Sequence, residues 1–145
     1  MEKIRVKKLK EKAILPTYGS IEAAGADLYA CLDENITIGP GESVFVPTGL
    51  AMEIPQGYAG FIYARSGLAC KRGLAPANKV GVVDSDYRGE FMVVLHNHGN
   101  MPQEIAHGER IAQLVITPVF TPGFTEVTEL ADTDRSDGGF GSTGK

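Results

Sequence analysis

The chain has 145 residues, of which 43% are hydrophobic and 22% charged, and its formal net charge is −4. This length predicts one domain spanning 1–145, with a core large enough to fold without disulfide or metal staples. The composition excludes a disordered chain, and the mildly acidic balance argues against a general nucleic-acid binder.

Short apolar runs, separated by turns that contain glycine or proline, recur along the chain. They are rich in β-branched and aromatic residues, so each is predicted to be a strand. The predicted strands are 4–7, 25–30, 36–38, 43–46, 50–54, 58–63, 80–83, 90–95, 103–105 and 111–116, and 16–20 is predicted to be a loop. Because no long stretch has helical periodicity, the predicted fold class is all-β, a sandwich or barrel.

The first predicted strand lies in a strongly basic segment. Six of the 14 Lys and Arg residues fall in the first twelve positions: Lys3, Arg5, Lys7, Lys8, Lys10 and Lys12. Lysines protect exposed sheet edges from pairing with other chains, so we expect a solvated edge strand, with an RNA or membrane contact as the alternative. No apolar leader follows, no apolar run approaches the length of a membrane span, and the two cysteines lack metal or redox spacing. We therefore expect a cytoplasmic protein with reduced thiols.

One short helix is predicted at 66–73. Ser66 has the side chain of a good helix N-cap, two bases fall in the last turn, and Gly73 ends the run. Arg65 stands directly before this helix. Because free N–H groups and the helix dipole attract anions, Arg65 and Ser66 are candidates for binding phosphate.

Residues 78–92 contain the candidate reactive carboxylate. A β-branched run, 80–83, is predicted to be a buried strand that ends in a turn of acidic residues. The simplest structure is a β-hairpin with Asp84, Asp86 and Tyr87 at its tip. A carboxylate at the end of a buried strand is partly desolvated yet reaches water, which suits a general base. The alternative is that the two aspartates only form the turn.

The segment 132–145 differs in composition from the rest of the chain. Four glycines lie between 138 and 144, and Phe140 is the only large apolar residue from 135 onward. One interpretation is a disordered terminus. The other is a flexible arm that orders over a ligand, with Phe140 stacking on it and backbone N–H groups binding an anion.

Metal-ligating side chains are sparse. His96 and His98 lie two positions apart and form at most half of a zinc site, because no third ligand has useful spacing. Four acids are candidates for holding a hard cation such as Mg2+, which prefers oxygen ligands and often arrives with phosphates. These acids are Asp27, Asp84, Asp86 and Glu90. No serine or cysteine is paired with a histidine by a recognisable motif.

Five sequence blocks occur in a fixed order. They are 24–29 (AGADLY), 64–69 (ARSGLA), Asn78 with 81–89 (GVVDSDYRG), 108–114 (GERIAQL), and Arg135 with 138–144 (GGFGSTG). Each block alone is weak, but together they form a specific signal that resembles the trimeric deoxyuridine triphosphate nucleotidohydrolases (dUTPases). One departure is visible, because the family usually has glycine after the arginine of the last block and this chain has Ser136. Serine restricts the backbone more than glycine, so we expect an effect on how the arm closes.

The resemblance implies a distorted jelly-roll β-sandwich or barrel with one short helix. It also implies a homotrimer whose three active sites are each shared between subunits, with the arm at 132–145 closing over the site of a neighbour. The implied reaction is hydrolysis of dUTP to dUMP and pyrophosphate, which removes dUTP from the nucleotide pool and supplies dUMP for dTMP synthesis. Neither nucleic acid nor membrane is an implied partner.

The resemblance also assigns roles to residues. Asp84 is the implied base that activates water for attack on the α-phosphorus, and Tyr87 packs against the deoxyribose and excludes a 2′-hydroxyl. Uracil would lie in the hairpin, above Met92. Mg2+ would be held by the triphosphate and by water without a direct protein ligand, and Asp27 would contact the ion only through a bound water. The implied substrate-binding set is Arg65, Ser66, Gly67, Asn78, Gly81, Val82, Val83, Asp84, Tyr87, Met92, Gln113, Arg135, Phe140, Gly141, Ser142 and Thr143.

Two alternatives belong to other functional classes. A dCTP deaminase of the same fold would carry a different acid in the third block and a different triplet in the second, whereas RSG at 65–67 and DSDY at 84–87 favour hydrolysis. A non-catalytic nucleotide-binding regulator would lack Asp84 or Tyr87, and both are present. The resemblance therefore favours a dUTP diphosphatase.

Overall fold

The computed structural model describes residues 3–144 and is built mainly from antiparallel strands. Met1, Glu2 and Lys145, which belong to the domain predicted at 1–145, lie outside the described residues. The described part contains twelve strands and one helix: β1 (Arg5–Lys8), β2 (Thr17–Tyr18), β3 (Ala26–Tyr29), β4 (Ile36–Ile38), β5 (Ser43–Pro47), β6 (Leu50–Glu53), β7 (Tyr58–Tyr63), α1 (Ser66–Arg72), β8 (Leu74–Pro76), β9 (Gly81–Val83), β10 (Met92–Asn97), β11 (Gln103–Ile105) and β12 (Arg110–Pro118).

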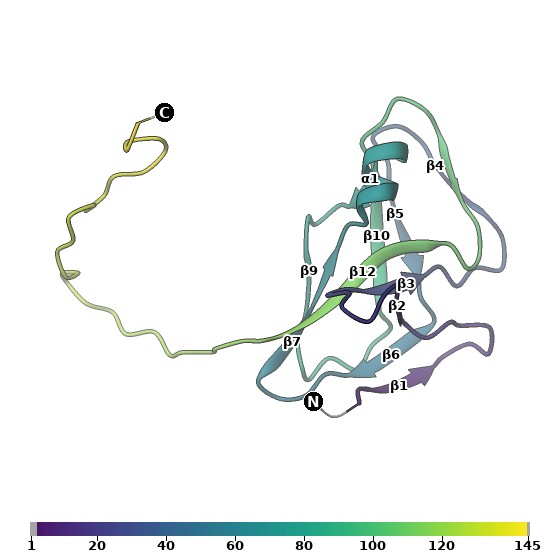
Figure 1. Ribbon diagram of the computed structural model, residues 1–145, viewed down its shortest axis with the longest axis horizontal. Coiled ribbons are helices and arrows are strands. Elements are labelled where there is room, and N and C mark those ends of the chain that lie inside the picture. Colours follow the sequence, from purple (N-terminus) through teal and green to yellow (C-terminus); the bar gives the residue numbers. More distant parts are fainter. Residues whose placement is uncertain (1–2, 145) are drawn as a thin grey trace.

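The strands form a jelly-roll sandwich around one core (Figure 1). A five-stranded sheet has the order β2-β3-β12-β7-β9, a three-stranded sheet has the order β5-β10-β8, and β1 with β6 and β4 with β11 form two ribbons. Side chains along β10 alternate between half-buried and buried, so that Val93 and Leu95 face the core. Each such buried side chain stabilises the fold by about 1.5–3 kcal/mol. The predicted all-β class is confirmed.

All ten predicted strands occur, three with the predicted ends and seven with slightly shifted ends, and two short strands were missed. β2 lies inside the segment predicted to be a loop, where Thr17 pairs with Asp27 and Tyr18 with Ala26. β8 follows the helix directly and includes Pro76, which a strand tolerates only at an edge or end. Both are too short to carry a period of their own, and their pairing partners are distant in sequence.

The predicted central hairpin is wrong. β9 pairs with β7, whereas β10 pairs with β5 and β8 in the other sheet. Residues 84–91 therefore cross between the two sheets, and we call them the crossover segment. The expected burial of 80–83 is also wrong, because Val82 is 59% exposed on an edge strand. Local patterning reveals two apolar runs near a turn but not the distant strands with which they pair.

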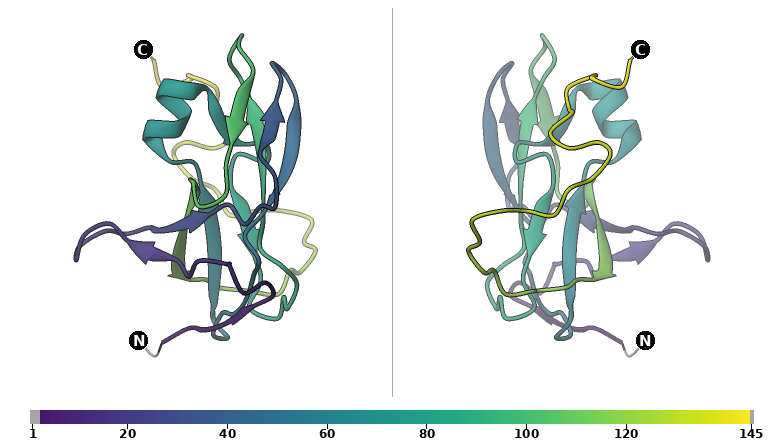
Figure 2. Two further views of the ribbon diagram at one scale, coloured as in Figure 1. Left: turned by 90° about the vertical axis from the view of Figure 1, so that its right-hand side faces the viewer. Right: turned by 90° about the vertical axis from the view of Figure 1, so that its left-hand side faces the viewer.

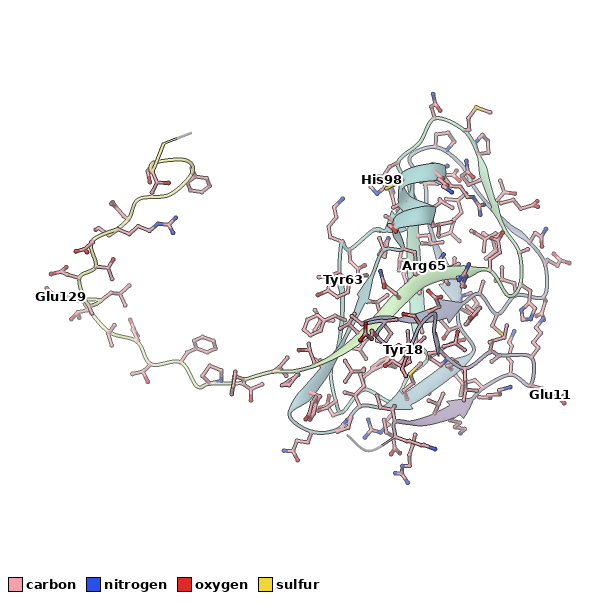
Figure 3. The ribbon with its side chains drawn as sticks, in the orientation of Figure 1. Glu11, Tyr18, Tyr63, Arg65, His98 and Glu129 are labelled. Carbon is pink, nitrogen blue, oxygen red and sulfur yellow. The ribbon has the colours of Figure 1, made fainter. Side chains whose placement is uncertain are left out.

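The predicted helix is confirmed, but the predicted N-cap is wrong. Arg65 occupies the cap position with an extended backbone (φ −91°, ψ 130°) and no side-chain cap bond, and Ser66 is the first helical residue. Gly73 ends the helix in the left-handed conformation (φ 66°), as predicted. Leu68 is buried and anchors α1 on the core. Figure 3 shows Arg65 beside β12, at the end of α1 from which the helix starts.

Beyond β12 the chain leaves the body as one extended segment (Figure 1). Its aromatic residues, Phe120, Phe124 and Phe140, are almost wholly exposed. Figure 2 shows that this segment loops outside the sheets and ends at the level of α1, at the opposite end of the molecule from the N-terminus. Within 3–144, no helix combines the length and hydrophobicity that crossing a membrane requires.

Candidate active site

A pocket of about 220 Å³ lies beside the crossover segment, where β9 ends. Seven residues of the predicted substrate-binding set line this crossover pocket: Asn78, Gly81, Val82, Val83, Asp84, Tyr87 and Met92. Ile62 and Phe91, which were not predicted, complete its apolar wall. Ile62 faces Gly81 across the β7–β9 pairing, and a Cβ at position 81 would lie 3.3 Å from the Ile62 Cβ. Glycine at this position therefore keeps the pocket open.

Hydrogen bonds within the crossover segment hold Tyr87 in place. The Tyr87 hydroxyl donates to the carbonyl oxygen of Glu90 at 2.9 Å. The Arg88 Nη1 donates to the carbonyl oxygens of Ser85 (2.7 Å) and Tyr87 (3.1 Å). The Tyr87 ring also packs on buried Phe91, with 6.2 Å between the ring centroids. The phenol ring is thus fixed at the pocket wall while 45% of the residue stays exposed.

Asp84 stands at the mouth of the crossover pocket, directly after β9, and also lines a neighbouring cleft of about 610 Å³. The expected partial desolvation is wrong for the single chain, because Asp84 is exposed. Among the ion pairs of residues 3–144, none involves its carboxylate. Both carboxylate oxygens are therefore available to accept hydrogen bonds from water.

A second pocket, of about 240 Å³, lies where β3 and β12 meet the start of α1. The residues that line this arginine pocket are Gly19, Ala23, Gly25, Asp27, Arg65, Ser66, Arg110 and Gln113. It therefore brings together three predicted substrate-binding residues, Arg65, Ser66 and Gln113, whereas Gly67 lines neither pocket. The arginine pocket and the crossover pocket share no lining residue.

Asp27 lies between the two guanidinium groups of the arginine pocket. Its Oδ1 accepts a hydrogen bond from the Arg65 Nε (2.8 Å), and its Oδ2 accepts one from the Arg110 Nη1 (3.4 Å). The side chain of Asp27 is 14% exposed and that of Arg65 is 25% exposed, so this ion pair is partly shielded from solvent. The four acids considered as cation ligands do not form a common site, because within 3–144 no group of three His, Cys, Asp or Glu side chains is suited to hold a metal ion.

Gln113 lies on the middle strand of the five-stranded sheet, opposite Asp27 on one side and Tyr63 on the other. Its Nε2 donates to the carbonyl oxygen of Ala64 (2.9 Å), just before α1. A Cβ at Gly25 would lie 2.3 Å from the Gln113 Oε1. Gln113 can therefore occupy this position only if residue 25 is glycine. This contact links the first sequence block to the fourth.

The two histidines predicted as at most half of a zinc site pack on each other instead. The rings of His96 and His98 have centroids 4.5 Å apart, and the His96 Nδ1 is hydrogen-bonded to the Ser43 hydroxyl (2.8 Å). Desolvation lowers the pKa of His98 below its usual value, and the charges of His96 and Lys79 lower it further. No third ligand accompanies the pair within the described residues, so the zinc hypothesis has no support.

The C-terminal arm holds the remaining predicted substrate-binding residues, Arg135, Phe140, Gly141, Ser142 and Thr143, and none of them lines either pocket. The Arg135 Nε donates to the carbonyl oxygen of Gly138 (2.8 Å) and closes a turn. Ser136, within this turn, has a φ of 48°, which is in the left-handed region that favours glycine. Glycine adopts this backbone conformation without strain, which is a physical reason why the resembled family usually has glycine at this position. Serine adopts it only at a cost in conformational energy.

Sequence reasoning also misjudged Glu90. It was a candidate cation ligand, but its Oε1 accepts a hydrogen bond from the backbone N–H of Gly49 (2.8 Å), and the residue lines the crossover pocket. Gly49 lies in the turn between β5 and β6, far from Glu90 in the sequence. No local pattern signals such a contact. The tertiary structure was needed to find it.

Comparisons with known proteins agree with this geometry. The dUTPase family model matches residues 11–144. The chain is 50% identical over 141 residues to the deoxyuridine 5′-triphosphate nucleotidohydrolase of Syntrophotalea carbinolica, covering 97% of this chain and 96% of that protein. Its fold matches a mutant dUTPase of Staphylococcus bacteriophage 80alpha with dUpNHpp (TM-score 0.92, 28% identity, 100% of both chains). It also matches a mutant dUTPase of phage phi11 of S. aureus in which a structural Mg(II) ion is coordinated (TM-score 0.82, 25% identity, 90% of this chain and 100% of that one).

Proposed function

Because the chain belongs to the dUTPase family, we propose that it hydrolyses dUTP to dUMP and pyrophosphate with Asp84 as the general base. One observation carries the assignment of the base. The crossover pocket has a carboxylate without an ion-pair partner at its mouth and a fixed phenol ring at its wall. A nucleoside bound in this pocket leaves its α-phosphate beside that carboxylate.

In this mechanism Asp84 accepts a proton from a water molecule as the water oxygen attacks the α-phosphorus. The bond from the α-phosphorus to its bridging oxygen breaks, and pyrophosphate leaves. General-base catalysis of this kind contributes typically about 10²–10⁴-fold. The exposed position of Asp84 in the single chain lets water reach it, and enclosure by a neighbouring subunit and its arm would exclude bulk water during the reaction.

Recognition of uracil rests on the edge position of β9. This strand is the last of its sheet, so one side of its backbone has no strand partner within the described residues. Its free N–H and C=O groups suit the N3–H donor and the carbonyl acceptors of uracil. Cytosine presents a reversed pattern and would leave buried groups unpaired, which costs about 1–3 kcal/mol per group. Asn78 would add a contact to the base or to the attacking water.

The remaining pocket walls account for two further exclusions. Tyr87 would pack against the deoxyribose and leave no room for the 2′-hydroxyl of UTP. Met92 lines the pocket beside the buried Phe91 ring, which gives the base an apolar floor. A 5-methyl group, as in dTTP, would clash with these walls because closely packed interiors have no spare volume for one.

The triphosphate would be bound by groups that the crossover pocket lacks. Arg65, Ser66 and Gln113 supply donors in the arginine pocket, and Gly67 exposes backbone at the same helix start. On the arm, Arg135, Gly141, Ser142 and Thr143 would contact the outer phosphates while Phe140 stacks on uracil. Arginine suits this task because its planar fork binds phosphate oxygens in pairs.

Because these three parts are separate in one chain, we propose a homotrimer in which each active site combines parts of several subunits. The crossover pocket of one subunit would meet the arginine pocket of a second, and the arm at 132–145 would close over the site of a neighbour. Docking of the segment that precedes the glycine-rich end would remove three largely exposed apolar side chains from water: Phe120, Phe124 and Leu130.

The fit of the chain to Mg2+ is an indirect one. Within 3–144 no group of three His, Cys, Asp or Glu side chains is suited to hold a metal ion, and we propose that the triphosphate and water would hold Mg2+. Mg2+ bound in this way neutralises phosphate charge. Asp27 is expected to contact Mg2+ only through a bound water. Both of its carboxylate oxygens accept hydrogen bonds from arginines within the single chain. It would therefore keep these bonds while contacting such a water. A cytoplasmic location fits the two free cysteines, Cys31 and Cys70.

The proposal is tested by incubating the protein and Mg2+ with dUTP, dCTP, UTP and dTTP, and measuring pyrophosphate and ammonia separately. Pyrophosphate from dUTP alone is expected. Ammonia from dCTP would identify a deaminase, and the absence of product from all four nucleotides would favour a regulator without catalytic activity.

A further inference from the structure

Glu90 makes two contacts that connect the phenol ring of Tyr87 to a distant part of the fold. Its carboxylate accepts a hydrogen bond from the Gly49 N–H (2.8 Å), and its backbone carbonyl accepts one from the Tyr87 hydroxyl (2.9 Å). The residue lies between a distant turn and the phenol ring at the pocket wall. Its carboxylate is part-buried, so the bond to Gly49 is shielded from competition with water.

The turn that Glu90 contacts is rigid. Gly49 has a φ of 68°, and a Cβ there would lie 2.9 Å from both the Ala13 Cβ and the Cys31 Sγ. The turn therefore packs against the core without free space. The neighbouring Thr48 is fully buried, and its Oγ1 donates to the Phe91 carbonyl oxygen (2.6 Å). Residues 90 and 91 of the crossover segment are thus hydrogen-bonded to a turn that packs closely against the core.

Gly89 makes the third contribution. A Cβ built on Gly89 would lie 2.4 Å from the Tyr87 hydroxyl oxygen and 2.5 Å from its Cζ. The phenol ring therefore folds back over residue 89, and only glycine leaves room for it there. Any side chain at 89 would push the ring away from the Glu90 carbonyl.

We propose that Glu90, with Gly89, determines the sugar specificity of this enzyme by positioning the Tyr87 ring. Gly89 leaves space for the ring. Glu90 connects the crossover segment to the turn at Gly49 through a hydrogen bond. Glu90 does not touch the reacting atoms. The inference rests on the proposed function, in which Tyr87 packs against the deoxyribose and excludes a 2′-hydroxyl. It adds that the exclusion depends on the contact between the Glu90 carboxylate and the Gly49 N–H.

The test measures kcat/KM for dUTP and for UTP in the full-length protein. In Glu90→Ala the kcat/KM for dUTP divided by that for UTP is expected to fall by about tenfold or more. The fall is expected mainly from faster UTP hydrolysis and a higher KM for dUTP. Glu90→Gln keeps a carbonyl oxygen that accepts the Gly49 N–H, so its ratio is expected within about twofold of the parent. Gly89→Ala, which leaves the Gly49 contact intact, is expected to lower the ratio as Glu90→Ala does.

Glu42→Ala is the matched control. The Glu42 Oε2 accepts a hydrogen bond from the Gly39 N–H (2.8 Å) in another turn, and Glu42 lines neither site pocket. Glu42→Ala removes the same kind of contact between a carboxylate and a backbone N–H. It is expected to leave the ratio of kcat/KM for dUTP to that for UTP unchanged. Equal losses with dUTP and UTP in Glu90→Ala and Gly89→Ala would overturn the proposal, because a general loss of folding does not alter discrimination. An inactive parent protein would instead refute the proposed function, which separates the two failures.

Discussion

Two aspartates show how differently this fold uses one side chain. Asp27 lies within β3, its side chain is 14% exposed, and each of its oxygens accepts a hydrogen bond from an arginine. Asp84 lies just outside β9, is exposed, and has no ion pair among those of residues 3–144. The lone pairs of the first carboxylate are occupied, and those of the second face water. Asp27 is therefore placed to hold two arginines, and Asp84 is left free to act as the base proposed above.

The largest effect is expected at the aspartate that faces water. Asp84→Asn keeps the size of the side chain but removes the proton acceptor, so kcat for dUTP is expected to fall by about 10³-fold. The dissociation constant of a non-hydrolysable dUTP analogue and the thermal midpoint are expected to stay near the parent values. Turnover within tenfold of the parent would show that Asp84 is not the base.

Asp27→Asn tests the other half of the comparison. Removing this charge leaves the partly buried Arg65 guanidinium and the exposed Arg110 guanidinium without their shared partner, so the free energy of unfolding is expected to fall by about 1–3 kcal/mol. The KM for dUTP is expected to rise about tenfold, because Arg65 loses the bond that orients it. Denaturant unfolding and steady-state kinetics measure the two effects.

The control for this variant is Asp33→Asn, which removes an exposed ion pair with Lys10 and Lys12. The midpoint of unfolding should then stay unchanged, because surface pairs contribute little. If saturating Mg2+ restored the KM of Asp27→Asn, the role of Asp27 would lie with the metal, whereas a KM that stays high at every Mg2+ concentration agrees with orientation of Arg65.

A smaller effect is expected when the arginine pocket is disturbed through its glycine. In Gly25→Ala the new methyl group would overlap the Gln113 Oε1, so Gln113 must leave its bond to the Ala64 carbonyl. We expect the KM for dUTP to rise about three- to tenfold with little change in kcat, because one neutral hydrogen bond is lost. Gly123→Ala is the control, since a Cβ there meets nothing within 4 Å. Equal KM values for the two variants would contradict the coupling of Gly25 to Gln113.

Ten of the twelve strands within 3–144 and the helix could be predicted from the sequence, because each of these follows from a local pattern. The partners of β9 and β10 could not, because two apolar runs beside a turn look alike whether they pair with each other or with distant strands. The ion pairs of Asp27 join residues 38 and 83 positions apart, and the Glu90 contact joins residues 41 positions apart. Sequence patterns therefore pointed to residues that line the two pockets, but not to the long-range contacts that hold these residues in place.

The smallest expected effect concerns the arm that would complete both pockets. Ser136 has a φ of 48°, which costs an L-residue about 1–2 kcal/mol, whereas glycine adopts it freely but loses more chain entropy on ordering, about 0.4–1 kcal/mol. The difference favours Ser136→Gly by about 0–1.6 kcal/mol, and from the lower half of this range we expect the KM for dUTP to fall two- to threefold with kcat unchanged. Ser136→Ala is the control, because it removes the hydroxyl and keeps the backbone cost. If both variants lowered KM equally, the hydroxyl group rather than the left-handed backbone would limit closure of the arm.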